Sequence, residues 1–434
     1  MIWIYNILLT LTAPLWVPWM LLRANRRNEK VNWKERTGTY NLDLGKDTAR
    51  IFFHAVSVGE VVAALPILQE IRKQWPEAKV VLSVTTSSGH QTAREKAEGL
   101  YDELVYFPID VARFTVNALF TVRPHVVAIM ETELWMNFLS TAKDFHCATL
   151  LINGRISDRS FPRSRKLRFF YQPLLENVDQ CLMQTEVDRT RILELGAKSA
   201  EVYGNCKFDQ AAESRSASGN EWRSKLGIPL DAFVVVVGST RGEEEEIFVT
   251  EALQQLSRDV VVVHAPRHIE RTDEILKLRS AKGLSTAKRS LGESGDYIML
   301  DTYGELDHVY SVADLVVIGG GFADLGGQNL IQPLALGKPV LHGPHMQNFR
   351  DVTEMADREG AAISCASPSE LAQQIEKVAN DSQLRSKMGQ AAKQLVDRQI
   401  GASRRYAEAI VSAGKVEFER RAELKARKEA NAKG

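Results

Sequence analysis

Short runs of apolar, mostly β-branched residues alternate with helical stretches from residue 50 onward. Five such runs precede residue 155, namely ARIFFHAV, AKVVLSVTT, DELVYFP, PHVVAIM and CATLLING. Five more follow in the second half, namely AFVVVVGST, DVVVVHAPR, YIMLDT, DLVVIGGG and KPVLHG. Strands whose apolar residues run nearly unbroken are buried on both faces, which is typical of parallel sheets covered by helices. The pattern predicts an α/β fold with two Rossmann-like, doubly wound domains.

A polar stretch at residues 209–222, which contains glycine and serine, suits a linker between these domains. We therefore expect an N-terminal domain at 50–208 and a C-terminal domain at 223–384. Residues 385–434 are strongly helical in pattern and end in a basic tail. For this tail, a solvated charged helix and a contact with anionic lipid both remain open.

The first 22 residues differ from the rest of the chain. They carry no charged side chain and three tryptophans, and a stretch of about 20 such residues can cross the hydrocarbon core of a bilayer. Pro14 and Pro18 should kink it and could hold it at the interface. We interpret 1–22 as a membrane anchor; a buried amphipathic helix is the alternative. The segment 23–49 that follows is basic, which favours a cytoplasmic main body; Arg23, Arg26, Arg27, Lys30, Lys34 and Arg36 oppose Glu29 and Glu35.

Overall charge and cysteine spacing exclude some classes of protein. Lys+Arg and Asp+Glu are equal at 55 each, so the chain lacks the positive field expected of a nonspecific nucleic-acid binder, and we expect no nucleic-acid partner. The cysteines lie far apart without a C-x-x-C pair, which argues against a zinc site or a disulfide framework and fits a reducing cytosol; they are Cys147, Cys181, Cys206 and Cys365.

The first candidate for chemistry follows the first predicted strand. Ser57, Gly59 and Glu60 stand where that strand runs into a helix, and such a turn presents backbone N–H groups and first-turn side chains to a ligand. Glu60 is therefore a candidate general base. An acid in the first helical turn is also favoured by the helix dipole alone, so a purely structural role stays open.

A pair of carboxylates, Glu131 and Glu133, follows the run PHVVAIM at the predicted carboxyl edge of the sheet. One of the pair could cap the helix expected near Asn137, so we assign one to structure and favour Glu131 for chemistry. Lys207, just before the predicted linker, could neutralise an anionic donor as charge develops on the leaving group. A surface lysine is the ordinary alternative for this residue.

Two loops in the second half suit a phosphate-containing ligand. The first follows AFVVVV and contains Ser239, Thr240, Gly242 and Glu243, where small residues let a phosphate approach the backbone. Its spacing matches neither G-x-G-x-x-G nor a P-loop. The second loop holds five glycines between 319 and 327 and leads into a helix. A strand predicted at the same edge of the sheet ends in the triplet Pro266, Arg267 and His268. The planar guanidinium of Arg267 suits a phosphate.

These motifs together resemble the 3-deoxy-D-manno-octulosonic acid (Kdo) transferases, glycosyltransferase family 30. The matching pieces are SVGE at 57–60, ETELW at 131–135, KFD at 207–209, PRH at 266–268, GEL at 304–306 and GGxNLxxP at 326–333. The resemblance covers nearly the whole chain. It implies an inverting enzyme of the GT-B architecture, with two Rossmann-like domains facing across a cleft, attached to the cell inner membrane. It also implies CMP-Kdo as donor, the lipid A precursor lipid IVA as acceptor, inner-membrane lipid as a contact, and neither a metal nor another cofactor.

Carried onto this sequence, the resemblance makes Glu60 the catalytic base and Glu131 and Lys207 the transition-state stabilisers. The family usually has His where this chain has Gln328, and Glu where it has Gln332. An amide still bonds a ribose hydroxyl but loses the charge-assisted strength of a carboxylate. Arg241 likewise stands where the family often has His. The implied nucleotide site comprises Pro266, Arg267, His268, Tyr303, Gly304, Glu305, Gly326, Gly327, Asn329, Leu330, Ile331 and Gln332, beside the loop with Ser239, Thr240, Gly242 and Glu243.

Two other functions fit parts of the pattern. A sugar-nucleotide epimerase of the nonhydrolysing type shares the two-domain fold but acts on soluble sugars, so the apolar residues 1–22 argue against it. A non-enzymatic protein that binds anionic lipid at a membrane is the second alternative. Loss of activity in a Glu60 variant would exclude the latter.

Overall fold

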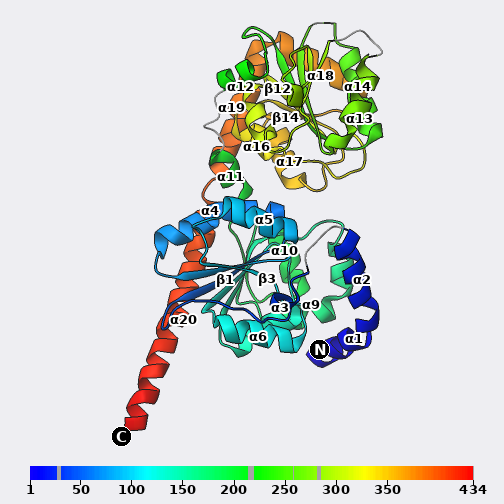
Figure 1. The fold of residues 1–434 in the computed structure, drawn as a ribbon. Helices are drawn as coiled ribbons and strands as arrows, with labels where there is room; N and C mark the ends of the chain where they lie inside the picture. Colours follow the sequence, from blue (N-terminus) through cyan, green and yellow to red (C-terminus); the bar gives the residue numbers. More distant parts are fainter. Residues whose placement is uncertain (27–30, 214–218, 258, 281–284, 434) are drawn as a thin grey trace. The chain divides into compact units, whose positions relative to one another are not determined.

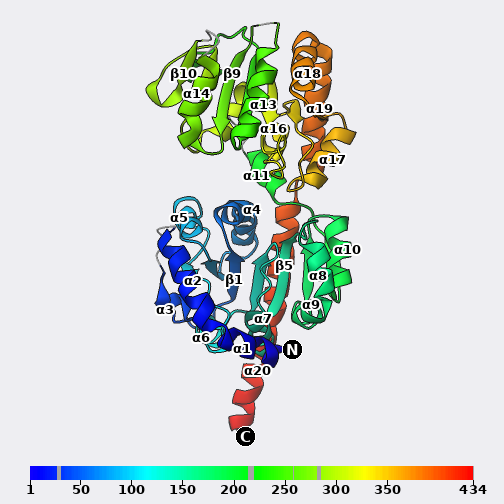
Figure 2. The ribbon, with the colours of Figure 1, turned by 90° about the vertical axis from the view of Figure 1, so that its right-hand side faces the viewer.

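The computed structural model divides into two compact units, shown in Figures 1 and 2. Unit 1 consists of Met1–Cys206 together with Gly401–Gly434, and unit 2 consists of Lys207–Ile400. Each unit has its own parallel sheet and its own hydrophobic clusters. The structure describes residues 1–26, 31–213, 219–257, 259–280 and 285–433.

Unit 1 is built on a seven-stranded sheet in the order β3-β2-β1-β4-β5-β6-β7, and all of its strand pairs are parallel. Successive residues point to opposite faces, so Phe53 joins the cluster that includes residues of α4 and α20, whereas Phe52 joins the cluster that includes residues of α6 and α7. The strands are β1 (Arg50–Ala55), β2 (Lys79–Val84), β3 (Glu103–Tyr106), β4 (Val126–Met130), β5 (Ala148–Gly154), β6 (Gln180–Met183) and β7 (Ala200–Val202).

Helices cover both faces of this sheet, and the last of them comes from the far end of the chain. Figures 1 and 2 show α20 along one side of unit 1, with its final turns extending past the other elements of that unit. The helices are α1 (Ile2–Leu11), α2 (Ala13–Arg26), α3 (Trp33–Arg36), α4 (Val58–Gln74), α5 (Ser87–Lys96), α6 (Ala112–Val122), α7 (Met136–Asp144), α8 (Phe161–Lys166), α9 (Arg168–Leu175), α10 (Glu186–Leu195) and α20 (Ala402–Lys433).

Unit 2 repeats this arrangement with a second seven-stranded parallel sheet, in the order β10-β11-β9-β8-β12-β13-β14. The strands are β8 (Val234–Thr240), β9 (Val261–Pro266), β10 (Thr286–Lys288), β11 (Tyr297–Met299), β12 (Leu315–Ile318), β13 (Val340–His342) and β14 (Ala362–Ser364). The helices are α11 (Lys207–Glu213), α12 (Gly219–Lys225), α13 (Glu243–Gln254), α14 (Thr272–Ser280), α15 (Leu306–Val309), α16 (Ile331–Ala335), α17 (Arg350–Arg358), α18 (Pro368–Asn380) and α19 (Ser382–Gln399), with short 3₁₀ helices at Ile269–Arg271, Arg289–Leu291 and Tyr310–Val312.

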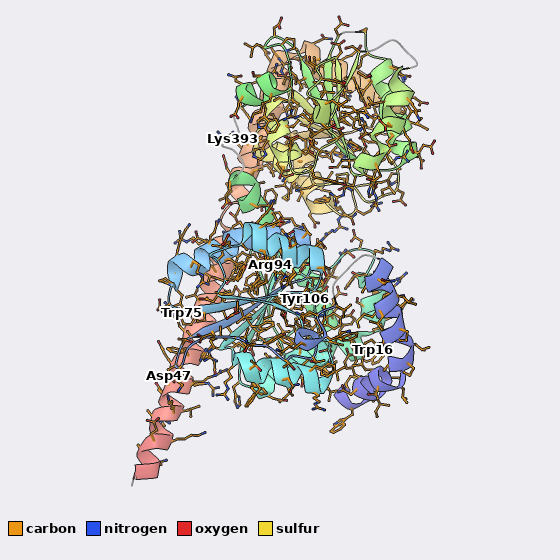
Figure 3. All side chains as sticks on the ribbon, viewed as in Figure 1. Trp16, Asp47, Trp75, Arg94, Tyr106 and Lys393 are labelled. Carbon is orange, nitrogen blue, oxygen red and sulfur yellow. The ribbon has the colours of Figure 1, made fainter. Side chains whose placement is uncertain are left out.

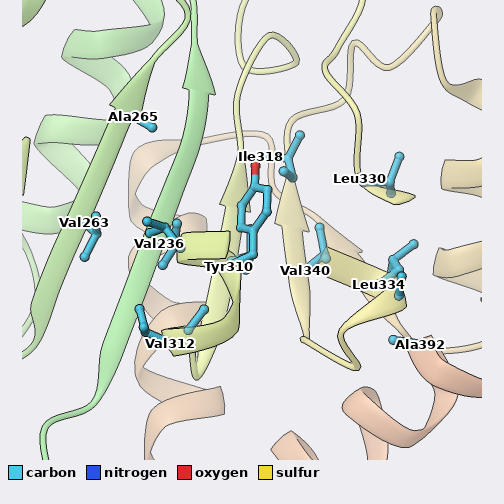
Figure 4. Close-up of a cluster of buried hydrophobic side chains, with 14 of the residues drawn as sticks. Val236, Val263, Ala265, Tyr310, Val312, Ile318, Leu330, Leu334, Val340 and Ala392 are labelled. Carbon is cyan, nitrogen blue, oxygen red and sulfur yellow. The ribbon is translucent and has the colours of Figure 1, made fainter. Parts of the chain in front are cut away.

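All ten strands predicted from apolar runs are present, and the two doubly wound sheets are confirmed. The strands β6, β7, β10 and β14 were not predicted. Each of these strands has three or four residues and includes a polar one, so none stands out as an apolar run, and all four lie at or next to the margin of a sheet. Figure 4 shows part of the core of unit 2, where Val236 of β8, Ile318 of β12 and Leu334 of α16 belong to the same hydrophobic cluster as Tyr310.

The boundaries between regions differ from the predicted ones. Residues 209–222 do not form an unstructured linker, because α11 and α12 occupy both ends of this stretch; 214–218 lie outside the described residues. Phe208, Ala211 and Trp222 are buried in the core of unit 2, and such sparse apolar residues do not make a polar stretch look helical. The region 385–434 is helical but divides between the units at Gly401, where φ is +98°.

The first 22 residues form two helices with a sharp bend, not one straight anchor helix. In the described part of the chain no single helix is both long and apolar enough to span a bilayer, although the pair Ile2–Leu11 and Ala13–Leu22, bent by 64°, meets that test together. Pro14 lies in the first turn of the second helix, where its missing N–H costs no hydrogen bond. The Trp16 indole donates to the Leu9 carbonyl at 3.0 Å and bridges the bend (Figure 3).

Part of the predicted basic segment 23–49 belongs to unit 1. The Arg36 guanidinium donates to the Thr85 carbonyl and lies 4.8 Å from the ring centre of Tyr106, which Figure 3 labels. Glu35 accepts from the Tyr106 amide at 2.7 Å, and Tyr40 is buried. Arg36 therefore has a structural role that a count of basic residues does not reveal, while Arg27 and Lys30 lie outside the described residues.

Candidate functional site

The two sheets each have a point where the strand order reverses, and ligands of open α/β sheets bind beyond the carboxyl ends of the strands at that point. In unit 1 the reversal falls between β1 and β4, which pair in parallel. Glu60 follows β1 by five residues and Glu131 follows β4 directly. The fold therefore brings these two predicted catalytic residues to neighbouring strand ends.

Glu60 lies in the first turn of α4 and is half-buried. Its Oε2 accepts from the Val56 amide at 2.8 Å, so the carboxylate closes its own turn. Ser57 is the N-cap residue, although its side chain makes no capping bond, and a Cβ on Gly59 would meet open space. Glu60 therefore has a structural role in the first turn of α4, as its place near the helix N-terminus allowed. The hydrogen bond from Val56 fixes the orientation of its carboxylate at the strand end.

Glu131 has a left-handed backbone, with φ of +56°, which is unusual for a residue with a side chain. Its amide donates to the Ile152 carbonyl at 3.0 Å, which ties the turn to β5. Backbone of this kind concentrates at functional sites. Burial raises the pKa of Glu133, and the nearby Glu131 charge adds to the effect, while the Trp135 indole donates to Glu133 at 3.1 Å. Glu133 is held in the structure by this bond.

The start of α7 is capped by Asp110, not by either glutamate. Its two oxygens accept from the amides of Asn137 at 3.1 Å and Phe138 at 2.9 Å. The prediction that one of the pair caps this helix is therefore wrong. Asp110 is distant in sequence and follows β3, so only the fold could show that it meets α7. It also accepts from the Tyr5 hydroxyl of α1 at 2.9 Å.

In unit 2 the order reverses between β8 and β12, and the two predicted phosphate loops follow these strands. Glu245, fully buried in the first turn of α13, links them: it accepts from the amides of Arg241 at 2.6 Å, Gly320 at 2.7 Å and Phe322 at 3.0 Å. Burial raises its pKa, and these amide bonds act in the opposite direction. The run of four glutamates at 243–246 marks this helix start, but the sequence does not show that Glu245, and not the predicted Glu243, turns inward.

The first loop turns some of its predicted groups inward. The Thr240 hydroxyl lies 2.7 Å from Nε2 of the buried His264, so this side chain is part of the core. Ser239 has a left-handed backbone with φ of +61°, and Gly242 has φ of +85° with open space around its Cβ position. Glu243 is exposed. The backbone of Ser239 and Gly242 and the side chain of Glu243 thus remain available at the carboxyl edge of the sheet. The side chain of Thr240 does not, because it faces the core.

The triplet at the end of β9 lies next to this loop. Pro266 is buried, Arg267 and His268 are exposed, and the Arg267 amide donates to the Thr240 carbonyl at 2.8 Å. Just beyond, Arg271 donates to both oxygens of the buried Glu246 at 2.7 to 2.9 Å. This bidentate pair anchors the segment that presents the Arg267 guanidinium at the sheet edge.

The loop after β11 presents an aromatic ring. Tyr303 is 74% exposed, and Gly304 next to it has φ of +82°. The Glu305 carboxylate accepts from the Thr302 hydroxyl and from Arg289, the latter at 3.2 Å. Glu305 therefore braces its own loop, whereas an exposed tyrosine at a strand end offers a face for a ring to stack upon.

The glycine-rich loop after β12 is closely packed against residues that follow β13. A Cβ on Gly326 would lie 2.3 Å from the Asn348 side chain, and one on Gly327 would lie 2.5 Å from the Met346 sulfur. Leu330 and Ile331 are fully buried in the core of unit 2, and Figure 4 shows the former among those side chains. Only their backbone could meet a ligand.

Two polar side chains of this segment stay at the edge. Asn329 and Gln332 are half-buried, and Asn329 Oδ1 accepts from the Ile331 amide at 3.0 Å. Gln328 is half-buried as well. Lys207, the remaining predicted stabiliser, is the first residue of α11 and is half-buried.

A cavity of about 650 Å³ in unit 2 is not near these loops. It is lined by residues at the amino ends of β8, β9 and β11, such as Phe233, Val261 and Tyr297. That is the opposite edge of the sheet from the ligand-binding one. The candidate site therefore lies at the carboxyl ends of the strands, and this cavity is not part of it.

Comparison with known proteins identifies the family. The family model for "3-Deoxy-D-manno-octulosonic-acid transferase (kdotransferase)" matches residues 31–210, and that for "Glycosyl transferases group 1" matches 277–395. The chain is 33% identical to the 3-deoxy-D-manno-octulosonic acid transferase of Chlamydophila psittaci, over 71% of this chain and 73% of that one. It is 31% identical to the transferase of the same name from Bordetella pertussis, over 94% and 98%.

Among solved structures, a glycosyltransferase from Rickettsia africae shares the fold, with a TM-score of 0.61 and 11% identity over 86% of this chain and 99% of that one. The predicted enzyme class is confirmed by the family match, and the epimerase and non-enzymatic alternatives fall away. This chain has the two Rossmann-like units of a glycosyltransferase and matches the family over most of its length. It belongs to the 3-deoxy-D-manno-octulosonic acid transferase family.

Proposed function

We propose that this enzyme transfers Kdo from CMP-Kdo to lipid IVA, with inversion at the anomeric carbon. The observation that carries the proposal is the position of Glu60 and Glu131 at neighbouring strand ends, beside the reversal point of the unit 1 sheet. In the proposed GT-B arrangement, unit 1 holds the acceptor and unit 2 holds the donor.

The reaction is a single displacement. Glu60 removes the proton from the 6′-hydroxyl of lipid IVA as that oxygen bonds to the anomeric carbon of Kdo, and CMP leaves with the electron pair of the broken bond. The hydrogen bond from the Val56 amide holds the Glu60 carboxylate in place at the end of β1. Glu131, fixed by its strained turn, stabilises the charge that develops on the sugar.

The donor is held by the loops that follow β8, β9, β11 and β12. The exposed Arg267 pairs with the phosphate, and Tyr303 offers its ring to the base. Lys207 stabilises the departing phosphate, so the reaction proceeds without a metal. Gln332 bonds the ribose as a neutral amide, more weakly than the carboxylate usual in the family.

Attachment to the inner membrane concentrates the enzyme near its lipid acceptor. Support comes from α1 and α2, whose outward side chains are large and apolar: Trp3, Leu11 and Leu15 are 71 to 80% exposed. The inward side is held to unit 1, since Asn6 and Asn137 exchange side-chain hydrogen bonds at 2.9 Å. An exposed apolar surface of this kind is typical of a membrane contact.

The test is transfer of labelled Kdo in detergent micelles. Purified full-length enzyme is incubated with lipid IVA, CTP, Kdo and a CMP-Kdo synthetase that supplies the donor, and the lipid product is analysed by mass spectrometry. We expect one or more Kdo masses added to the lipid. A folded enzyme that leaves lipid IVA unmodified would remove the proposal, and the product mass also gives the number of sugars added.

A further inference from the structure

A cavity of about 280 Å³ lies inside unit 1, next to Glu131. Part of its lining follows β4 and β5, where Glu131, Arg155 and Ser157 stand at the carboxyl edge of the sheet. It continues past Leu151 in the middle of β5 to Leu195 at the end of α10. Because α10 starts at the carboxyl edge and runs back, the cavity is a slot that descends from the catalytic edge along the sheet.

The two ends of this slot have different chemistry. The end at the edge carries a carboxylate, a guanidinium and hydroxyl groups, beside the apolar Leu134 and Ile156. The inner end is aliphatic, and Leu151, Ile192 and Leu195 there are at most 2% exposed. A free sugar would leave the inner end unfilled, and a nucleotide would desolvate its charges against leucine and isoleucine. A molecule with a polar head and an apolar tail matches both ends.

The outer wall of the slot carries the charge expected beside a lipid. Ser160 and Ser164 line the cavity, and the chain around them forms α8 and α9. Between 159 and 175 there are five basic residues and no acidic one, and Leu167 and Phe169 are 46% and 63% exposed. Basic residues alternating with exposed apolar ones suit the surface of an anionic bilayer.

This wall is also continuous with the N-terminal helices. The rings of Tyr5 in α1 and Phe170 in α9 lie 6.0 Å apart, and both side chains pack against the same hydrophobic cluster. The exposed apolar side of α1 and the basic helices that cover the slot therefore belong to one connected part of unit 1. A lipid held at that surface lies beside the slot.

We propose that the slot binds an acyl chain of the lipid acceptor, with the sugar to which it is attached lying at Glu131. This inference rests on the proposed function and adds to it a site for the apolar part of the substrate. The chain enters at the carboxyl edge and packs against Leu151, Ile192 and Leu195. Acceptor recognition then includes the lipid tail as well as the sugar, and it places the reacting hydroxyl near Glu131 and Glu60.

The test narrows the slot with larger side chains. Ser164→Phe fills it from the buried side of α8, and Ser160→Trp narrows it from an exposed position that tolerates a large residue. Ser199→Trp, at an exposed position of unit 1 that does not line the cavity, is the matched control. Each variant is assayed with lipid IVA and with its fully deacylated, water-soluble analogue.

We expect KM for lipid IVA to rise by roughly tenfold or more in both slot variants, because a few methylenes lose their burial. KM for the deacylated acceptor and KM for CMP-Kdo should stay within about twofold, a split that general damage to the fold would not give. Equal losses with both acceptors would assign the slot to the sugar, and unchanged KM would leave it without a role; either result overturns the inference.

A second measurement does not depend on transfer. Dodecanoic acid, titrated below its micelle concentration into the full-length wild-type enzyme and followed by calorimetry, should bind at a single site, and Ser164→Phe should weaken that binding by roughly tenfold. No saturable binding, or equal binding in the variant, contradicts the slot. If the enzyme binds the fatty acid but transfers no Kdo to lipid IVA, the proposed function fails, and with it the assignment of the slot to this acceptor, while a site for an apolar chain remains.

Discussion

The carboxylate of Glu245 accepts a hydrogen bond from the backbone amide of Gly320 at 2.7 Å, across 75 residues of sequence. The same side chain holds the amides of Arg241 and Phe322, so it joins the loop after β8 to the loop after β12. The amides that a glycine-rich loop offers to a phosphate are therefore partly used by the protein itself. Glu245 therefore shapes the loops of the proposed donor site through backbone contacts.

Replacing Glu245 by alanine should destabilise unit 2. Three backbone amides would lose their acceptor in a buried place, and each unsatisfied group costs about 1–3 kcal/mol. After partial relaxation we expect a loss of about 2–4 kcal/mol in the free energy of unfolding, measured by urea titration, together with weaker CMP binding. Glu244→Ala, an exposed residue in the same helical turn, should change stability by less than about 0.5 kcal/mol. Equal effects from both variants would contradict the bridging role.

Asp110 gives a prediction for pH. Burial raises its pKa to about 6, from about 3.9 in an unfolded chain, although the bonds from Tyr5, Asn137 and Phe138 act in the opposite direction. Between these values the folded protein binds a proton that the unfolded chain lacks. Stability should therefore fall as the pH rises from about 4 to about 7, by a contribution on the order of 3 kcal/mol from this group.

The variant Asp110→Asn isolates that contribution, because an amide does not titrate. The difference in free energy of unfolding between wild type and variant should shift with pH across the window from about 4 to about 7, in the direction of a less stable wild type at higher pH. Denaturant titrations at several pH values measure it. A difference that stays constant over this range would show that the buried carboxyl does not take up a proton there.

The fold could be predicted from sequence because buried strands leave a local signal. The run FVVVVG is apolar along its whole length, and β8 forms there; AEV carries no such signal, and β7 is found only by its pairing with β6. Contacts between segments that are distant in sequence leave no such local signal. Asp110 meets α7, and Glu245 meets Gly320, only after the sheets have formed.

In the candidate site, too, some features could be predicted from the sequence and others could not. Glu60 and Glu131 were predicted from their places after strands, and the structure puts both strand ends side by side. Thr240 was chosen by the same argument, yet its hydroxyl turns inward to His264. A strand end fixes where the backbone lies but not which way each side chain points, because that depends on what packs beside it.

The exposed apolar face of α1 and α2 should govern membrane attachment. We expect the triple variant Trp3→Ser, Leu11→Ser and Leu15→Ser to move most of the protein from the membrane to the soluble fraction, since each large apolar side chain gains about 1.5–3 kcal/mol when buried. Leu230→Ser is the control, because this leucine is 78% exposed in unit 2. Fractionation of cells, followed by immunoblotting, measures the effect. Retention of the triple variant on membranes would place the attachment elsewhere.

Glu60→Gln tests the chemistry most directly. The amide oxygen of glutamine can still accept from the Val56 amide, so the first turn of α4 should remain closed and the fold intact. Glutamine cannot take a proton from the acceptor hydroxyl, and we expect the rate of transfer to lipid IVA to fall by about 10²–10⁴-fold. CMP binding, measured by calorimetry, should stay within about twofold of wild type, because the proposed donor loops belong to unit 2. If Glu60→Gln transfers Kdo at the wild-type rate, Glu60 is only a helix-capping residue and the base lies elsewhere.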